Sequence, residues 1–73
     1  MTLRLICAIP DPGNAGSPRG LFYDNTPEGH AHAKEFARAQ DRPGWGVFEC
    51  VSTFREPTME AFDEVLKLNG WRR

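Results

Sequence analysis

The sequence is poor in the features that mark several large classes of protein. It holds only two cysteines, Cys7 and Cys50, too few for a disulfide framework and without the spacing of a metal site. No apolar run approaches the ~20 residues of a membrane-spanning helix. Lysine and arginine total 9 against 10 aspartate and glutamate, so the basic excess of nucleic-acid-binding proteins is missing. We therefore expect a cytoplasmic protein with reduced thiols, no bound metal, no membrane segment and no nucleic-acid partner.

The chain is also short. Its 73 residues are expected to form one domain, 1–73. A chain of this size buries only about 60% of the surface that its unfolded form exposes. One small core rarely contributes more than ~3–5 kcal/mol, so oligomerisation or a bound partner is a common additional source of stability.

The most strongly patterned stretch is 44–55, GWGVFECVSTFR. Apolar residues occur at both even and odd positions. The even positions hold Phe48, Cys50 and Phe54, and the odd positions hold Trp45, Val47 and Val51. Alternation in a run rich in β-branched and aromatic residues is typical of a strand. Because both sides of this strand are apolar, we interpret it as the central strand of a small sheet.

Two shorter strands are expected before it. Residues 3–9 alternate, and Pro10 ends that strand because it has no amide hydrogen for a ladder. A loop dense in turn-forming residues, PDPGNAGSPRG, covers 10–20. Residues 21–23 then form a short second strand.

Two amphipathic helices are also expected. Thr26 is the predicted N-cap of the first, Pro27 fits its first position, and the segment 41–44 stops it. Small residues dominate the stripe that faces inward, which holds Gly29, Ala33, Phe36, Ala37 and Gln40. The second helix covers 59–68, with Met59, Ala61, Phe62, Val65, Leu66 and Leu68 facing inward. Gly70 ends it in the left-handed conformation, and Trp71 is predicted to pack back against Leu66.

The element order is therefore β-β-α-β-α. We predict a two-layer α+β sandwich, in which a three-stranded sheet carries both helices on one face. The second and third strands are joined through a helix, which favours a parallel arrangement with a right-handed crossover. The pattern leaves open whether the first strand lies in the middle of the sheet or at its edge.

No catalytic set emerges from the sequence. His30 and His32 point roughly 200° apart on a helix, so one ion cannot bind both. Cys50 lies mid-strand on the face assigned to the core, whereas a catalytic thiol needs access and a positive environment. We therefore predict a protein that is not an enzyme and has no cofactor.

The sheet face turned away from the helices is the leading candidate for an interface. It would expose apolar side chains that include a tryptophan, a combination common at protein contacts: Ile6, Ala8, Trp45, Val47 and Val51. Scattered apolar residues on an ordinary surface are the alternative. Either of the first two strands could also extend the sheet into that of a partner.

The loop 11–20 suggests a different function. Its glycines, a serine and an arginine resemble the parts of an anion cradle, and the free amides of a helix start attract anions as well. The residues of this candidate site are Asn14, Gly16, Ser17, Arg19 and Thr26. The pattern matches neither a P-loop nor a dinucleotide fingerprint.

The sequence thus predicts a small non-catalytic interaction or inhibitor protein that binds a protein partner or forms a homodimer. The alternative is a binder of a small anionic ligand such as a nucleotide. Size alone also fits an accessory protein of a phage or another mobile element, although no residue carries that association.

Overall fold

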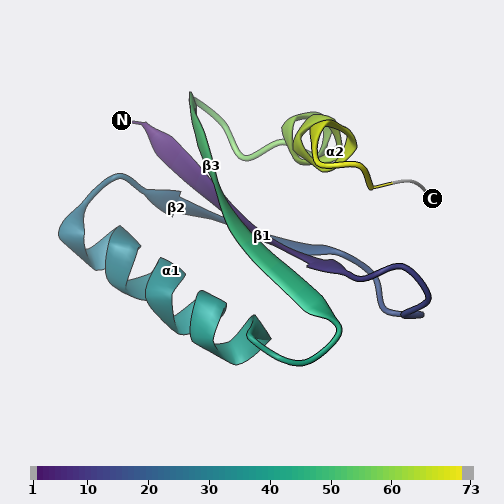
Figure 1. Cartoon of the computed structure of the whole chain (residues 1–73). Helices are drawn as coiled ribbons and strands as arrows, with labels where there is room; N and C mark the ends of the chain where they lie inside the picture. The colour runs from purple at the N-terminus through teal and green to yellow at the C-terminus, as the bar shows by residue number, and fades with distance from the viewer. Residues whose placement is uncertain (1, 72–73) are drawn as a thin grey trace.

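The computed structural model describes residues 2–71. Along the chain lie β1 (Leu3–Pro10), β2 (Arg19–Asp24), α1 (Pro27–Gln40), β3 (Trp45–Phe54) and α2 (Met59–Leu68). The predicted order of elements is confirmed, and every strand and helix begins or ends within about two residues of its predicted limit. Figure 1 shows the three strands crossing the middle of the molecule with one helix on each side.

The sheet has the order β2-β1-β3, and both pairs are antiparallel. The prediction that 44–55 forms the central strand is therefore wrong, because β3 lies at an edge. The central strand is β1, whose residues Leu5 to Ala8 are all buried. Burial on both faces is what an interior strand requires. In β3, by contrast, Val51 is 89% exposed.

β2 and β3 run in the same direction, since each is antiparallel to β1. Helix α1 connects them, as expected for a crossover connection. The two strands are not neighbours, however, because β1 occupies the place between them. The crossover connection therefore passes over β1, which precedes both strands in the sequence.

The two helices cover opposite faces of the sheet, so the prediction that both lie on one face is wrong. Leu5 and Cys7 of β1 pack with Val65 of α2, whereas Ile6 packs with Ala33 of α1. Successive side chains of a strand point to opposite faces. The α+β class is confirmed, and the molecule has three layers, helix, sheet and helix (Figure 1).

The helix ends follow local sequence signals. Thr26 caps α1 and Thr58 caps α2, each hydroxyl accepting a hydrogen bond from an amide three residues on, at 3.1 Å. Gly70 has φ +82° and ends α2, as predicted. The Trp71 amide donates to the Leu66 carbonyl at 3.0 Å, which is the main-chain bond that this type of cap forms.

The apolar stripe of α2 is only partly buried. Val65 and Leu66 are buried, but Met59 is 67% and Leu68 80% exposed, so the prediction that these two face inward is wrong. The helix covers the narrow sheet with its middle turns, and its two ends extend beyond that contact. Across residues 2–71, neither helix has the length and apolar character needed to cross a membrane.

Candidate interaction edge

The predicted outer face is not open, because α1 lies on it. Ile6 is 6% exposed and Ala8 is fully buried, and Ile6 belongs to the core cluster that includes Ala33 of α1. Neither residue can reach a partner while α1 stays in place. The prediction of an accessible interface at Ile6 and Ala8 is wrong for this reason.

Trp45 is also engaged by its own chain. A Cβ atom at Gly16 would lie 2.6 Å from the Trp45 ring, so the indole rests directly on that glycine. The Arg42 guanidinium lies 5.0 Å from the centre of the same ring, within the range of a cation–π contact. Trp45 therefore fixes the loop before β2 against the start of β3. Of the predicted interface, Val51 is exposed, and Val47 and Trp45 are half-buried and so remain partly accessible.

Two loop residues of the predicted anion site, Asn14 and Gly16, hold the loop in place. The Asn14 side chain donates to the Gly44 carbonyl at 3.0 Å and accepts from the Gly16 amide at 2.9 Å. One end of its amide group thus joins the loop to the residue before β3, and the other end holds the loop itself. Ser17 and Arg19 lie exposed beside it.

The structure does not bring Thr26 to this loop. Arg19 begins β2 and Thr26 follows its end, and a strand of six residues is roughly 20 Å long. The Thr26 hydroxyl also accepts the Gly29 amide as the cap of α1. The predicted anion site made of Asn14, Gly16, Ser17, Arg19 and Thr26 is therefore not assembled, because its parts lie at opposite ends of β2.

The feature that stands free is the outer edge of β3. The Asp11 amide donates to the Gly44 carbonyl at 2.8 Å, which makes these two a hydrogen-bonded pair in the β1–β3 register. Such pairs alternate along an antiparallel ladder. The amide and carbonyl groups of Val47 and Glu49 consequently point away from β1. No strand in the described part of the chain pairs with them.

The opposite edge, on β2, is shorter and better protected. β2 has six residues against ten in β3, and it begins with the charged Arg19 and ends with the charged Asp24. The Asp24 carbonyl also accepts the Thr26 amide at 2.8 Å. Short length and charged residues both disfavour pairing at a sheet edge.

A bulge limits the usable length of β3. Leu5 pairs with Cys50 and Leu3 with Phe54, so residues 51–53 lie opposite Arg4 alone. The Arg4 guanidinium spans this irregular region and donates to the Cys50 carbonyl at 3.2 Å. The regular edge therefore covers 45–50, with Val51 at its end.

The charged side chain of this edge is held by a hydrogen bond from its own sheet. Glu49 is the one charged residue of β3, and its carboxylate accepts a hydrogen bond from the Tyr23 hydroxyl across the face of β1. Burial, the hydrogen bond to Glu49 and its negative charge together raise the pKa of Tyr23 to about 12. Glu49 is exposed, but the hydrogen bond holds its carboxylate towards β2 and away from the open edge, where a free charge would disfavour pairing.

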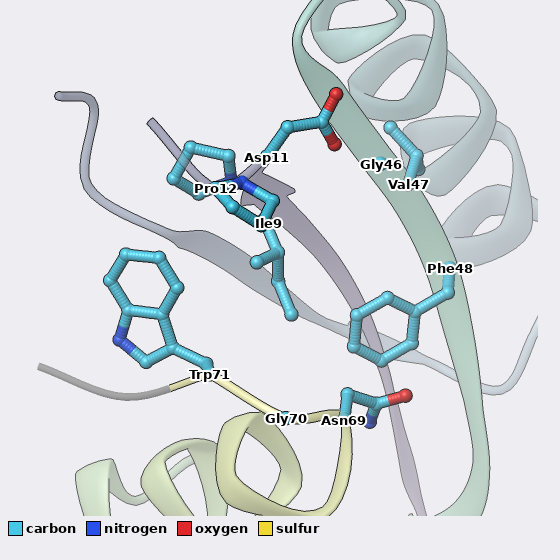
Figure 2. A pocket seen from close by; sticks show the side chains of 10 residues that line it. Ile9, Asp11, Pro12, Gly46, Val47, Phe48, Asn69, Gly70 and Trp71 are labelled. Carbon is cyan, nitrogen blue, oxygen red and sulfur yellow. The ribbon is translucent and has the colours of Figure 1, made fainter. Parts of the chain in front are cut away.

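A hollow lies beside the edge on each face of the sheet. On the α2 face, a groove of about 550 Å³ is formed where β1, β3 and the segment after α2 meet. Figure 2 shows Ile9, Phe48 and Trp71 around this space. On the α1 face, a hollow of about 350 Å³ lies between α1 and β3 and is bordered by Lys34, Val47 and Glu49. Both hollows include Val47 and Phe48, so they flank the same short stretch of edge.

The remaining chemically active side chains do not converge. His30 contacts Asn25 at 3.0 Å and stacks edge-on against Tyr23, while His32 borders a different hollow beside β2. Within residues 2–71, no group of three or more His, Cys, Asp or Glu side chains is arranged to hold a metal ion.

Both thiols are free. Cys7 pairs with Phe48 and Leu5 pairs with Cys50, which places the cysteines diagonally on one face. Diagonal neighbours are ~7–8 Å apart, beyond the ~4.4–6.8 Å between Cα atoms that a disulfide needs. Burial, with a smaller effect of Cys50, raises the pKa of the Cys7 thiol to about 12.

Comparison with protein-family models, curated proteins and solved structures finds no match to this chain. The geometry of β3 and its surroundings therefore carries the functional argument alone.

Proposed function

We propose that this protein is a small non-catalytic interaction protein that binds another polypeptide by adding a strand to the open edge of β3. The observation that carries the proposal is the outward-facing main chain of Val47 and Glu49, in a strand paired on one side only. Strand addition uses such main-chain groups for affinity.

The two hollows support the same mode of binding. In an added strand, successive side chains point to opposite faces of the sheet. One side chain would enter the groove of Ile9, Phe48 and Trp71, and the next would lie in the hollow near Lys34. Pockets for alternate side chains are how strand-adding domains select their ligands.

An accessory or inhibitory role in the cytoplasm fits this proposal. A domain that covers a strand of another protein can block that protein without any chemistry of its own.

The proposal is tested by replacing Val47 with proline. The Val47 amide faces the open edge, so Val47→Pro removes a donor for an added strand and leaves the β1 ladder intact. Short random peptides displayed on a carrier are selected on the wild-type protein, and the enriched peptides are measured against both proteins. We expect Val47→Pro to weaken their binding by at least about tenfold.

Val47→Thr is the matched control, because it keeps the amide and the β-branched shape. It should bind the selected peptides nearly as well as the wild type. Enriched peptides that bind Val47→Pro as tightly as Val47→Thr would place the binding site elsewhere. A selection that enriches no peptide would also count against the proposal.

A further inference from the structure

We infer that the strand added at this edge is β3 of a second copy of the chain, running antiparallel, with Phe48 on the two-fold axis. This inference rests on the proposed function and names its partner. It is carried by the fit of β3 to itself, in main-chain bonds, side-chain pairs and charge.

The main-chain groups match under two-fold symmetry. With Phe48 opposite Phe48 of the second copy, Val47 stands opposite Glu49. Both residues present an outward amide and carbonyl, so they exchange two hydrogen bonds. The symmetry repeats this exchange on the other side of the axis. An interface in which one patch meets itself is the usual form of a homodimer.

Side-chain pairs select this register among the symmetric ones. Centring the axis on Glu49 would place two carboxylates directly opposite each other, which is unfavourable. Centring it on Val47 would leave Val51 beyond the paired segment. The axis at Phe48 sets Val51, which is 89% exposed in the single chain, opposite Trp45 of the second copy. Aromatic and β-branched residues form favourable cross-strand pairs.

The groove on the α2 face has room for the central pair. Phe48 is half-buried at its border, and Gly46 next to it has no side chain to fill the space. The Phe48 ring of the second copy enters beside the first. On the α1 face, the Glu49 carboxylate of each copy stays on Tyr23 of its own chain, so neither carboxylate is directed at the partner strand.

The size and charge of the chain favour self-association. A net charge of −1 gives little repulsion between copies. A single domain this small gains stability when a second copy covers a sheet edge and its apolar border.

The inference is tested by disulfide trapping. Residues in a non-hydrogen-bonded antiparallel pair have Cα atoms about 4.5 Å apart, which a disulfide can span. In a background of Cys7→Ala and Cys50→Ser, which also removes the native thiol directly opposite position 48, Phe48→Cys should form a covalent dimer under mild oxidation. Val51→Cys in the same background is the control, because its thiol is more exposed but meets Trp45 rather than itself. We expect trapping of the first variant at least about tenfold faster than that of the second.

A measurement on the wild-type chain covers the case in which Phe48→Cys does not fold. Amide exchange at Val47 and Glu49 should slow as concentration rises, while native mass spectrometry shows a growing share of dimer. A monomer at all concentrations, with fast exchange at both amides, would overturn the inference. If peptide binding still depends on the Val47 amide in that case, the proposed function stands without the dimer. If peptide binding does not depend on it either, both the proposed function and the inference are wrong.

Discussion

Gly29 lies where the first turn of α1 meets the end of β2. A Cβ atom at this position would come 1.9 Å from the Asp24 carbonyl oxygen, far inside contact distance. The obstacle is main chain, which cannot rotate aside. This glycine is therefore required for the approach of the helix to the strand, and not for an unusual backbone angle.

Gly29→Ala should lower the free energy of unfolding by about 3 kcal/mol or more, because β2 and α1 must separate to admit the methyl group. Urea unfolding followed by circular dichroism measures the change. Gly46→Ala is the control, since its Cβ would meet only the Ile9 carbonyl oxygen at 3.9 Å. A loss for Gly29→Ala no larger than that for Gly46→Ala would contradict the close approach.

Two buried residues should make the protein sensitive to alkali. The pKa of Cys7 rises from 9.0, and that of Tyr23 from 10.0, to about 12 in the folded chain. The unfolded chain ionises first as pH rises, so it releases protons that the folded chain keeps. The stabilisation is fully present below about pH 9 and is lost between about pH 9 and pH 12. The urea midpoint of the wild type should fall as pH rises through this range, and that of Cys7→Ala should fall less steeply. An identical dependence on pH in the two proteins would contradict the assignment to Cys7.

The ends of the helices could be predicted from sequence because they depend on neighbouring residues. Thr26, Pro27 and Gly70 each act within one or two turns of their own position. The stripe of α1 was predicted for the same reason, and its members Gly29, Ala33 and Gln40 are buried. The exposure of Met59 and Leu68 could not be read from the wheel, because it depends on how far the sheet extends beneath α2.

Helix α2 is attached to the sheet through few side chains. Phe62 rests on Gly20, where a Cβ atom would lie 2.5 Å from its ring, and Val65 reaches Leu5 and Cys7. Phe62→Ala should lower the free energy of unfolding by about 2 kcal/mol, the lower end for a phenylalanine, since its side chain is only half-buried.

The same substitution should act on α2 more than on α1. Amide exchange in 59–68 should become faster, while that in 27–40 changes only with global stability. Met59→Ala, at an exposed position of the same helix, is the control and should leave both helices unchanged. Equal acceleration in the two helices would show that α2 opens only with the whole domain.

At the scale of the whole molecule, strand order and helix placement were the parts that the sequence did not reveal. Both faces of β1 and of β3 carry apolar residues, so either strand could be interior by pattern alone. The deciding contacts join residues far apart in the chain, such as Leu5 with Val65 and Ile6 with Ala33. The Tyr23–Glu49 bond was missed for the same reason, although alternation places Glu49 on the face of Ile6.

The two tryptophans allow a test of cooperativity. Trp45 rests on Gly16 beside β3, and Trp71 borders the groove after α2, so they report on different parts of the fold. Because each core layer is small and both share β1, we expect a single unfolding transition. Each of the variants Trp45→Phe and Trp71→Phe keeps one tryptophan. In both, the unfolding midpoint followed by fluorescence should match the midpoint followed by circular dichroism. Separate midpoints would show that the two layers unfold independently.

The central place of β1 also bears on how the chain folds during synthesis. β1 precedes every element that packs on it, so it is available as a template when β2 emerges from the ribosome. A hairpin of β1 and β2 can form early, followed by α1 and then β3 on the remaining side. Until β3 arrives, the second side of this template is open to any extended segment nearby. Nascent chains on one messenger are thus most exposed to mispairing in the interval between α1 and β3.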